Sequence, residues 1–302
     1  MLAYLRALLA MPATLSRLSA ASERQALMLG RLLAARVREC REVASLADVE
    51  FQVFSQFGDD GIIQWLVHRL AIEPRTFVEF GVEDYAESNT RFLMMNDDWS
   101  GLVMDASPRN VRRIVGAPWF WRHALDARAA FVDRDNVNAL IAASGLRGDI
   151  GLLHVDIDGN DYWIWDAIDV VSPAIAILEY NSVLGPDRAI TVPYDPAFDR
   201  RRAHPSCLYY GASLLALHRL ATARGYAFVG CNSAGNNAYF VRRDRLRDGV
   251  REVSPEAGYV ASRFRESRDA RGRLSLLAGD SRLAAIRGLP VINVDTGRPE
   301  SL

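Results

Sequence analysis

The feature that most limits the fold is the alternation of short apolar runs with helical stretches between residues 56 and 243. Short runs rich in aromatic and β-branched residues, ended by glycine or polar residues, are typical of buried strands. Strands alternating with helices indicate βαβ units around a parallel sheet that is covered on both faces. The predicted strands are residues 76–81, 101–107, 119–127, 149–158 and 174–182, then an antiparallel pair within 226–243 joined by a Ser-Ala-Gly-Asn-Asn turn. The predicted helices are residues 56–70, 88–97, 107–115, 133–145, 161–169 and 211–225.

Size and charge restrict the class of the protein. A chain of 302 residues, half of them apolar, can form one large domain with additions. We expect a helical extension over residues 1–48, a central domain over 49–248 and a C-terminal extension or tail over 249–302. A net charge of −1 argues against nucleic acid as a main partner. The three cysteines have neither zinc-site spacing nor the even number of a disulfide framework, so we expect a cytoplasmic protein.

Both ends of the chain lie outside the alternating region. Residues 1–15 are apolar, but Arg6 and Pro12 interrupt them and no basic region precedes them, so we predict neither a signal peptide nor a membrane span. Residues 14–43 predict helices that pack on the body of the protein or on a second copy of the chain, or that attach to the inner face of a membrane. Residues 288–302 predict a short strand followed by a free tail, and we assign no chemistry to the C-terminal stretch.

Acidic residues follow almost every central strand. In open α/β sheets, ligands bind beyond the carboxyl ends of the strands, so side chains at these ends are candidates for a site. Asp and Asn are also common helix caps and turn formers, which explains any one of them singly. Five successive strand ends with acids instead favour one acidic rim that needs a ligand. These residues are Glu79, Asp105, Asp126, Asp156 with Asp158, and Glu179 with Asn181.

Four stretches of the chain carry a resemblance to a known family. "FSQFGDDGII", "FVEFGVEDYAESNTRFL", "WSGLVMDAS" and "GLLHVDIDGNDYWIW" resemble the FkbM-like family of class I S-adenosylmethionine-dependent methyltransferases. The resemblance covers residues 50–245. It implies a Rossmann-like, doubly wound, mostly parallel seven-stranded sheet, to which this chain adds an N-terminal helical extension. It also implies S-adenosylmethionine as the cofactor and O-methyl transfer, many members being associated with polysaccharide or natural-product pathways.

The resemblance suggests how the cofactor would be held. Asp105, beside Ala106, would accept the ribose hydroxyls, as an acid at this position does in dinucleotide-binding sheets. Gly81, with Glu79, would let the backbone approach the cofactor closely. The other cofactor candidates are Asp126 near the adenine amine, Ser55 and Gln56 over the amino-acid head, Asn89 and Asp156. The glycine-rich fingerprint of the superfamily is reduced here to "EFGVEDYAES", which leaves the pose of the cofactor open and also argues against a nicotinamide dehydrogenase.

The acids after the fourth and fifth strands predict a metal. An alcohol is a poor nucleophile at neutral pH, and a divalent ion bound to its oxygen lowers its pKa. Hard ions such as Mg²⁺ or Mn²⁺ prefer carboxylate and carbonyl oxygens, which Asp156, Glu179 and Asn181 offer. Asp158 is the candidate general base, and His154 is a second candidate that can equally be a buried structural residue.

The acceptor is expected to contact the long segment 182–213. Segments of this length in compact domains are often binding loops or lids. Its aromatic and charged residues suit the sugar hydroxyls and phosphates of a glycan or sugar-nucleotide acceptor, although a rigid structural insertion is the alternative. The candidate residues are Arg188, Tyr194, Asp195, His204, Tyr209 and Tyr210.

Two other functions remain open on the sequence. The Asp-x-Asp pattern at 156–158 also matches metal-dependent glycosyltransferases that bind a nucleotide sugar, although it does not explain the acids at the earlier strand ends. The glycine-poor loop is also compatible with a binding or scaffold protein that has kept a methyltransferase fold without catalysis.

Overall fold

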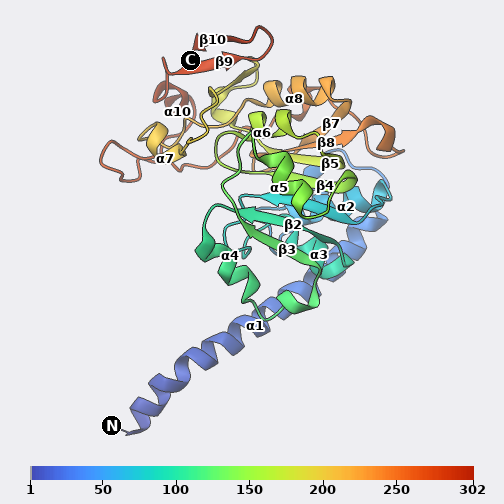
Figure 1. The fold of residues 1–302 in the computed structure, drawn as a ribbon, viewed down its shortest axis with the longest axis vertical. Coiled ribbons are helices and arrows are strands. Elements are labelled where there is room, and N and C mark those ends of the chain that lie inside the picture. Colours follow the sequence, from blue (N-terminus) through green and yellow to red (C-terminus); the bar gives the residue numbers. More distant parts are fainter. Residues whose placement is uncertain (1) are drawn as a thin grey trace.

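The computed structural model describes residues 2–302, and in the first helix it leaves the side chains of residues 2–10, 12, 13 and 16 undescribed. Its centre is a seven-stranded sheet (Figure 1) in the order β3-β2-β1-β4-β5-β8-β7. Strands β1 to β5 run parallel, and β8 lies antiparallel between β5 and β7. The strands are β1 (Thr76–Phe80), β2 (Ser100–Asp105), β3 (Leu125–Ala129), β4 (Gly148–Val155), β5 (Val171–Glu179), β7 (Tyr226–Cys231) and β8 (Asn237–Arg242). The predicted seven-stranded, mostly parallel sheet is confirmed.

Helices cover both faces of this sheet, as the doubly wound prediction requires. On one face, Phe77 and Val103 pack with α1, α2 and α3. On the other face, Val78 and Leu102 pack with α5, α6 and α8. The two cores follow from the alternation of side chains along each strand. The helices are α1 (Leu2–Glu39), α2 (Asp59–Arg69), α3 (Arg91–Asp97), α4 (Pro108–Val115), α5 (Val137–Ala143), α6 (Asp161–Ala167) and α8 (Leu214–Ala223), with short 3-10 turns at Leu46–Val49, Phe120–Arg122, Ser182–Leu184 and Arg243–Arg245.

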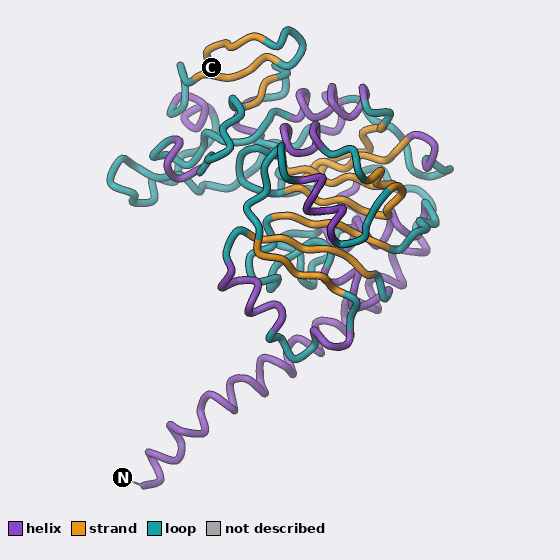
Figure 2. The backbone as a smooth tube through the Cα atoms, viewed as in Figure 1, coloured by secondary structure: helices purple, strands orange, loops and turns teal. Residues whose placement is uncertain are grey.

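The first helix is longer than predicted, and its N-terminal part extends away from the body of the molecule (Figure 2). Its C-terminal part packs on α2 and α3, where Ala34 and Val37 are buried and Arg38 pairs with Asp97. Glu23 forms an ion pair of 2.8 Å with Arg91, which holds the middle of the helix to the start of α3. Within the described residues, no helix has both the length and the apolarity that a membrane span requires.

The C-terminal stretch folds back on the segment between β5 and α8. A small second sheet joins β6 (Ile190–Thr191) to β9 (Pro290–Asn293) and β10 (Arg298–Ser301). The prediction of a free tail is therefore wrong, because β10 pairs with β9 and the Leu302 N–H donates to the Leu289 carbonyl. The short helices α7 (Arg200–Ala203), α9 (Pro255–Gly258) and α10 (Asp280–Ala284) complete this region.

Candidate functional site

A cleft of about 1360 Å³ opens at the carboxyl ends of β1, β2, β4 and β5. Its lining comes from the loops that follow these strands, from the loop before α2, from α7 and from the C-terminal stretch. This is the edge at which open α/β sheets bind ligands. Of the predicted site residues, those in the lining are Gln56, Glu79, Gly81, Asn89, Asp105, Ala106, His154, Asp156, Asp158, Glu179 and Tyr210.

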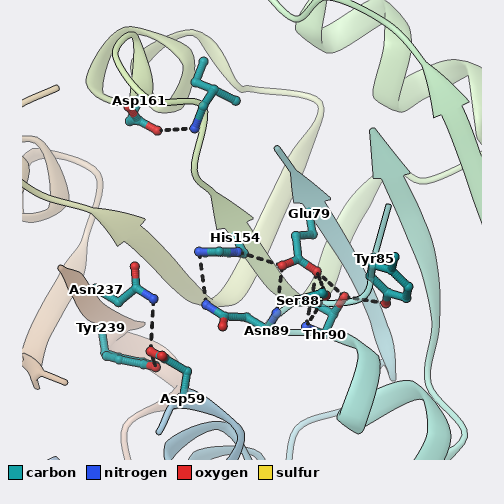
Figure 3. A network of polar contacts seen from close by, with 11 residues as sticks. Asp59, Glu79, Tyr85, Ser88, Asn89, Thr90, His154, Asp161, Asn237 and Tyr239 are labelled. Atoms are coloured by element: carbon teal, nitrogen blue, oxygen red, sulfur yellow. Dashed lines mark hydrogen bonds and ion pairs between the residues drawn. The ribbon is translucent and has the colours of Figure 1, made fainter. Parts of the chain in front are cut away.

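The Glu79 carboxylate lies at the centre of a hydrogen-bond network on one side of the cleft (Figure 3). Its buried carboxylate accepts hydrogen bonds from the Ser88 hydroxyl (2.6 Å), the Asn89 backbone N–H (2.9 Å) and both the N–H and the hydroxyl of Thr90. His154 Nδ1 lies 2.9 Å from it. Burial acts to raise the pKa of Glu79, but the contacts with His154, Ser88 and Thr90 outweigh burial and lower it. Glu79 therefore stays ionised and fixes the loop between β1 and α3.

His154 is held between two partners. Its Nδ1 faces Glu79, and its Nε2 lies 3.2 Å from the Asn89 amide nitrogen. Burial acts to lower the pKa of His154, yet the hydrogen bond and charge of Glu79 raise it overall. Both ring nitrogens are thus occupied by protein groups, which supports the structural alternative for this residue over proton transfer.

The backbone at Gly81 requires a glycine, in a loop between β1 and α3 that contains no other. Its φ of +76° lies in the left-handed region, and a Cβ there would lie 1.6 Å from the Asp156 carbonyl oxygen. Glu83 and Tyr85 also have positive φ, although neither is glycine. The glycine therefore allows β1 and β4 to end side by side, whatever binds above them.

The loop before α2 is organised in the same way, by a buried carboxylate. Asp60 accepts the backbone N–H groups of residues 53–55 and the hydroxyl of Ser55. Burial raises the pKa of Asp60 to about 6 despite these hydrogen bonds. The Ser55 hydroxyl in turn accepts the Asp60 N–H (3.1 Å), and Ser55 is not in the cleft lining, whereas Gln56 and Phe57 are. Neighbouring Asp59 accepts from Asn237 and Tyr239, which ties α2 to β8 (Figure 3).

The ends of β2 and β3 differ in what they offer the cleft. Asp105 lines the cleft, and its Oδ1 accepts the Ser107 N–H (2.8 Å) and the Asn110 side-chain amide (3.0 Å). Its Oδ2 accepts the Glu83 N–H (2.9 Å) and keeps a free lone pair. Asp126 was predicted at the end of a strand over 119–127, and this is wrong. The strand starts at Leu125 and ends at Ala129, so Asp126 lies near its beginning, paired with Arg128.

Asp161 folds the loop after β4 around its own carboxylate. It accepts the N–H groups of Ile157 (2.8 Å) and Gly159 (2.9 Å), which turns the chain immediately after Asp156. Gly159 packs against Phe198, where a Cβ would lie 2.2 Å from the ring. The Asp156 carboxylate makes no hydrogen bond within the described part of the chain and lines the cleft.

Three carboxyl groups meet at the floor of the cleft. One oxygen from each of Asp156, Asp161 and Glu179 lies within 4.8 Å of the others. Glu179 is buried, and its Oε2 has no hydrogen-bond partner among the described residues. Burial, reinforced by the neighbouring acids, raises the pKa of Asp156 to about 7 and that of Glu179 well above its ordinary value. Burial also raises the pKa of Asp161 to about 6.

The expected third ligand, Asn181, is not part of this cluster. Its amide nitrogen donates to the carbonyls of Leu208 (2.9 Å) and Tyr210 (3.0 Å), and its Oδ1 accepts the Val183 N–H (3.0 Å). All of its polar atoms are used to hold the segment after β5. The prediction that Asn181 is a metal ligand is wrong for this reason, and Asp161 lies where a third oxygen was expected.

Asp158 faces a cation rather than the acidic floor. Its carboxylate lies 2.7 Å from the Arg200 guanidinium, which also stacks on Tyr210 with 3.9 Å between Cζ and the ring centre. Asp158 has a φ of +58°, so the loop turns sharply between Asp156 and Asp158. The two carboxylates of the Asp-x-Asp pattern therefore have different partners.

Five of the six predicted acceptor residues lie outside the cleft lining, and Tyr210 alone of these six is in it. Arg188 pairs with Glu300 (2.7 Å) and the Tyr209 hydroxyl donates to Pro290, so both support the small sheet. The Tyr194 hydroxyl accepts the Arg134 N–H, and the Asp195 carbonyl accepts from Asn160. His204 contacts Ser206. Except for the partner of His204, these partners are at least 35 residues away in the sequence, which explains why sequence reasoning did not find these contacts.

The C-terminal stretch, to which no chemistry was assigned, forms part of the cleft wall. Phe264 stacks on Phe57, with 4.6 Å between ring centres, and so connects this stretch to the loop before α2. Ser262, Arg265, Glu266 and Arg282 also line the cleft. In the sequence, the arginine content of residues 249–302 was the one signal that this stretch could contribute charged groups to a site.

Comparison with known proteins finds distant similarity to solved structures. No family model and no curated protein matches the chain. Among solved structures, the O-methyltransferase from Bacillus cereus in complex with SAH is similar with a TM-score of 0.41 and 14% identity, covering 73% of this chain and 89% of that one. The SAH-bound methyltransferase PaMTH1 of Podospora anserina is similar with a TM-score of 0.41 and 15% identity, covering 76% of this chain and 95% of that one. The N-terminal domain of EvdMO1 with SAH bound is similar with a TM-score of 0.39 and 12% identity, covering 70% of this chain and 93% of that one.

The acidic floor predicts a pH-dependent stability for the metal-free protein. The pKa of Asp156 is raised from 3.8 to about 7, so its ionisation lowers the free energy of unfolding progressively between these two pH values, and the full loss is present above about 7. Asp156→Asn should match the wild type at pH 4 and exceed its free energy of unfolding by about 2 kcal/mol at pH 8, measured by urea denaturation with a chelator present. The exposed Asp187, replaced by Asn, gives the baseline. A gain that does not change with pH would contradict the raised pKa.

Proposed function

We propose that the protein is an S-adenosylmethionine-dependent O-methyltransferase of the FkbM-like type, acting on a sugar hydroxyl of a cell-surface glycan or its precursor with the help of a divalent cation. The observation that carries this proposal is the single cleft that contains both Asp105, at the end of β2, and the uncompensated carboxylates Asp156 and Glu179, after β4 and β5. Asp105 suits a ribose hydroxyl, because its Oδ2 accepts one hydrogen bond from the described chain and keeps a lone pair for a hydroxyl donor.

The residues at the floor fit a hard divalent cation. Three carboxylates with raised pKa values, one of them with a buried oxygen that lacks a hydrogen-bond partner within the described chain, form a donor set of the kind that Mg²⁺ or Mn²⁺ prefers. Asp156, Asp161 and Glu179 would hold the ion. When bound, it would lower the pKa of an acceptor hydroxyl and orient it.

The chain's own residues supply the remaining roles. Asp158 is the candidate proton acceptor, because it lies beside the floor and is partly exposed to the cleft. Its ion pair with Arg200 would orient the carboxylate, and a proton taken from the acceptor would require that pair to loosen. Phe57 and Phe264 would exclude water from one side of the cleft.

Cofactor binding tests the proposal directly. By calorimetry, we expect the full chain to bind S-adenosylhomocysteine, and Asp105→Ala to weaken that affinity about tenfold or more through the lost hydrogen bonds to the ribose. Asp126→Ala is the matched control, since this acid of the neighbouring strand lies outside the cleft lining. Binding of UDP-glucose in place of adenosylhomocysteine would favour a glycosyltransferase, and binding of neither would favour a scaffold.

Metal binding is tested separately. We expect Mn²⁺ affinity, measured by titration calorimetry, to fall about tenfold or more in Glu179→Gln, because a neutral amide replaces an anionic ligand. The affinity for adenosylhomocysteine should stay within about twofold, since Asp105 is unchanged. Asp126→Asn serves as the control for the loss of one carboxylate. Equal Mn²⁺ affinity in Glu179→Gln and wild type would remove the ion from the proposal.

A further inference from the structure

Five arginines line the mouth of the cleft, above the acidic floor. They come from α7 and from the C-terminal stretch, two regions that the small sheet brings together (Figure 1). Arg200 pairs with Asp158, but the other four form no ion pair within the described part of the chain. The five are Arg200, Arg201, Arg202, Arg265 and Arg282.

Within the described chain, Arg282 is held by neutral oxygens alone. It donates to the carbonyl (2.8 Å) and hydroxyl (3.0 Å) of Ser262, while its buried Nε has no partner among the described residues. Burial lowers the pKa of Arg282, and the charge of Arg200 acts in the same direction. A guanidinium held by neutral oxygens beside a second guanidinium is stabilised by an anion that reaches both.

The acids near the mouth do not supply that anion. Asp199 accepts the N–H groups of Arg201 (2.8 Å) and Arg202 (3.2 Å), so it caps α7. Glu266 lies 3.8 Å from Arg268. The side chains of Arg201, Arg202 and Arg265 are exposed, and their guanidinium groups are available to a ligand in the cleft.

We propose that this arginine mouth binds an oxyanion carried by the acceptor, either a phosphate or a sugar carboxylate. The inference rests on the proposed methyl transfer and specifies its substrate class. Because the acidic floor repels anions and the mouth attracts them, an acceptor with one anionic end enters in one orientation. Its neutral hydroxyl then lies toward Asp156 and Asp158, and its oxyanion lies against α7 and Arg265.

Calorimetry with three probes, without divalent cations, tests the mouth. We expect inorganic pyrophosphate or glucuronate to bind the full chain, and glucose to bind about tenfold more weakly or not at all. Preference for pyrophosphate assigns a phosphorylated acceptor, and preference for glucuronate assigns an acidic sugar. The double variant Arg202→Glu/Arg265→Glu should lose about tenfold or more of the anion affinity, whereas Arg247→Glu, an exposed control outside the cleft lining, should lose none.

The outcomes separate this inference from the proposed function. If neither anion binds better than glucose, or if the double variant binds anions as the wild type does, the arginine mouth is not an oxyanion site. Adenosylhomocysteine binding, which should stay within about twofold in the double variant, reports on the proposed function independently. Anion binding without adenosylhomocysteine binding would reject methyl transfer and keep the anion site.

A second observation concerns the exposed face of α1. At about 100° per residue, Leu27, Gly30, Ala34 and Val37 share the face that packs on the body. The opposite face carries large apolar side chains with exposed fractions between 52% and 70%. These are Met11, Leu15, Leu18, Met28, Leu29 and Leu32.

Arginines flank this apolar face on one side. Arg17, Arg24 and Arg31 recur every seventh residue, so they form one row along the helix, and no ion pair of theirs occurs within the described residues. The acids of α1 are Glu23, which pairs with Arg91, and Glu39 at its end. A second copy of α1 therefore offers no acidic row to match these arginines, whereas anionic lipid headgroups do.

We infer that this face of α1 lies on an anionic membrane surface. The arrangement of apolar residues beside a basic row is that of interfacial helices, whose binding combines apolar burial with attraction to anionic lipid. The inference is independent of the proposed function, because α1 lies outside the cleft.

Vesicle co-sedimentation of the full chain tests it. We expect binding to phosphatidylcholine vesicles that contain phosphatidylglycerol, and about tenfold weaker binding to phosphatidylcholine alone. Leu18→Glu/Leu29→Glu and Arg17→Glu/Arg24→Glu/Arg31→Glu should each abolish it, with Arg247→Glu as control. Absence of binding by the wild type would overturn the inference. So would a dimer in light scattering that Leu18→Glu/Leu29→Glu dissociates while vesicle binding is unchanged.

Discussion

The hydrogen bonds to the Glu79 carboxylate hold together three of the segments that border the cleft. This acidic side chain of β1 receives the N–H groups of Asn89 and Thr90 just before α3, the hydroxyls of Ser88 and Thr90, and His154 from β4. The loop between β1 and α3 can therefore keep a fixed path with a single glycine, although residues such as Glu83 and Tyr85 adopt positive φ. Each such residue costs about 1–3 kcal/mol, and charge-assisted hydrogen bonds of this kind offset that cost.

A second buried glutamate, Glu179, shows what the hydrogen bonds of Glu79 imply for function. Glu179 is the last residue of β5 and Glu79 the last but one of β1, and both are buried. The hydrogen bonds of Glu79 lower its pKa, whereas the Glu179 carboxylate accepts none from the described residues and its pKa is raised. A fold has no stability reason to keep an uncompensated acid next to Asp156 and Asp161, because a neutral residue would be more favourable there. The contrast between the two is the strongest argument that the floor of the cleft receives a ligand.

The sequence predicted the sheet and the acidic rim well, because both depend on local patterns. Apolar periodicity placed the strands, and strand ends placed Asp105, Asp156 and Glu179 at one edge. The errors arose at side chains whose actual position or hydrogen-bonding partner differs from the one predicted by only a few residues. Asn181 bonds to the backbone of the following segment, and Asp126 lies at the start of its strand because Phe120–Arg122 forms a turn instead of extending it. The position of the Arg188 side chain depends on its ion pair with Glu300, 112 residues later in the sequence, and no local pattern indicates this contact.

These long-range contacts show which parts of the chain the small sheet connects. Arg188, Tyr209 and the strands β6, β9 and β10 join the segment after β5 to the end of the chain. That connection holds Phe264, Arg265 and Arg282 over a cleft whose floor comes from the central sheet. Residues that were expected to contact the acceptor therefore support the wall of the cleft. The opposite charges of floor and wall come from parts of the chain that are far apart in sequence, so the small sheet determines how the arginines of the wall lie relative to the acids of the central sheet.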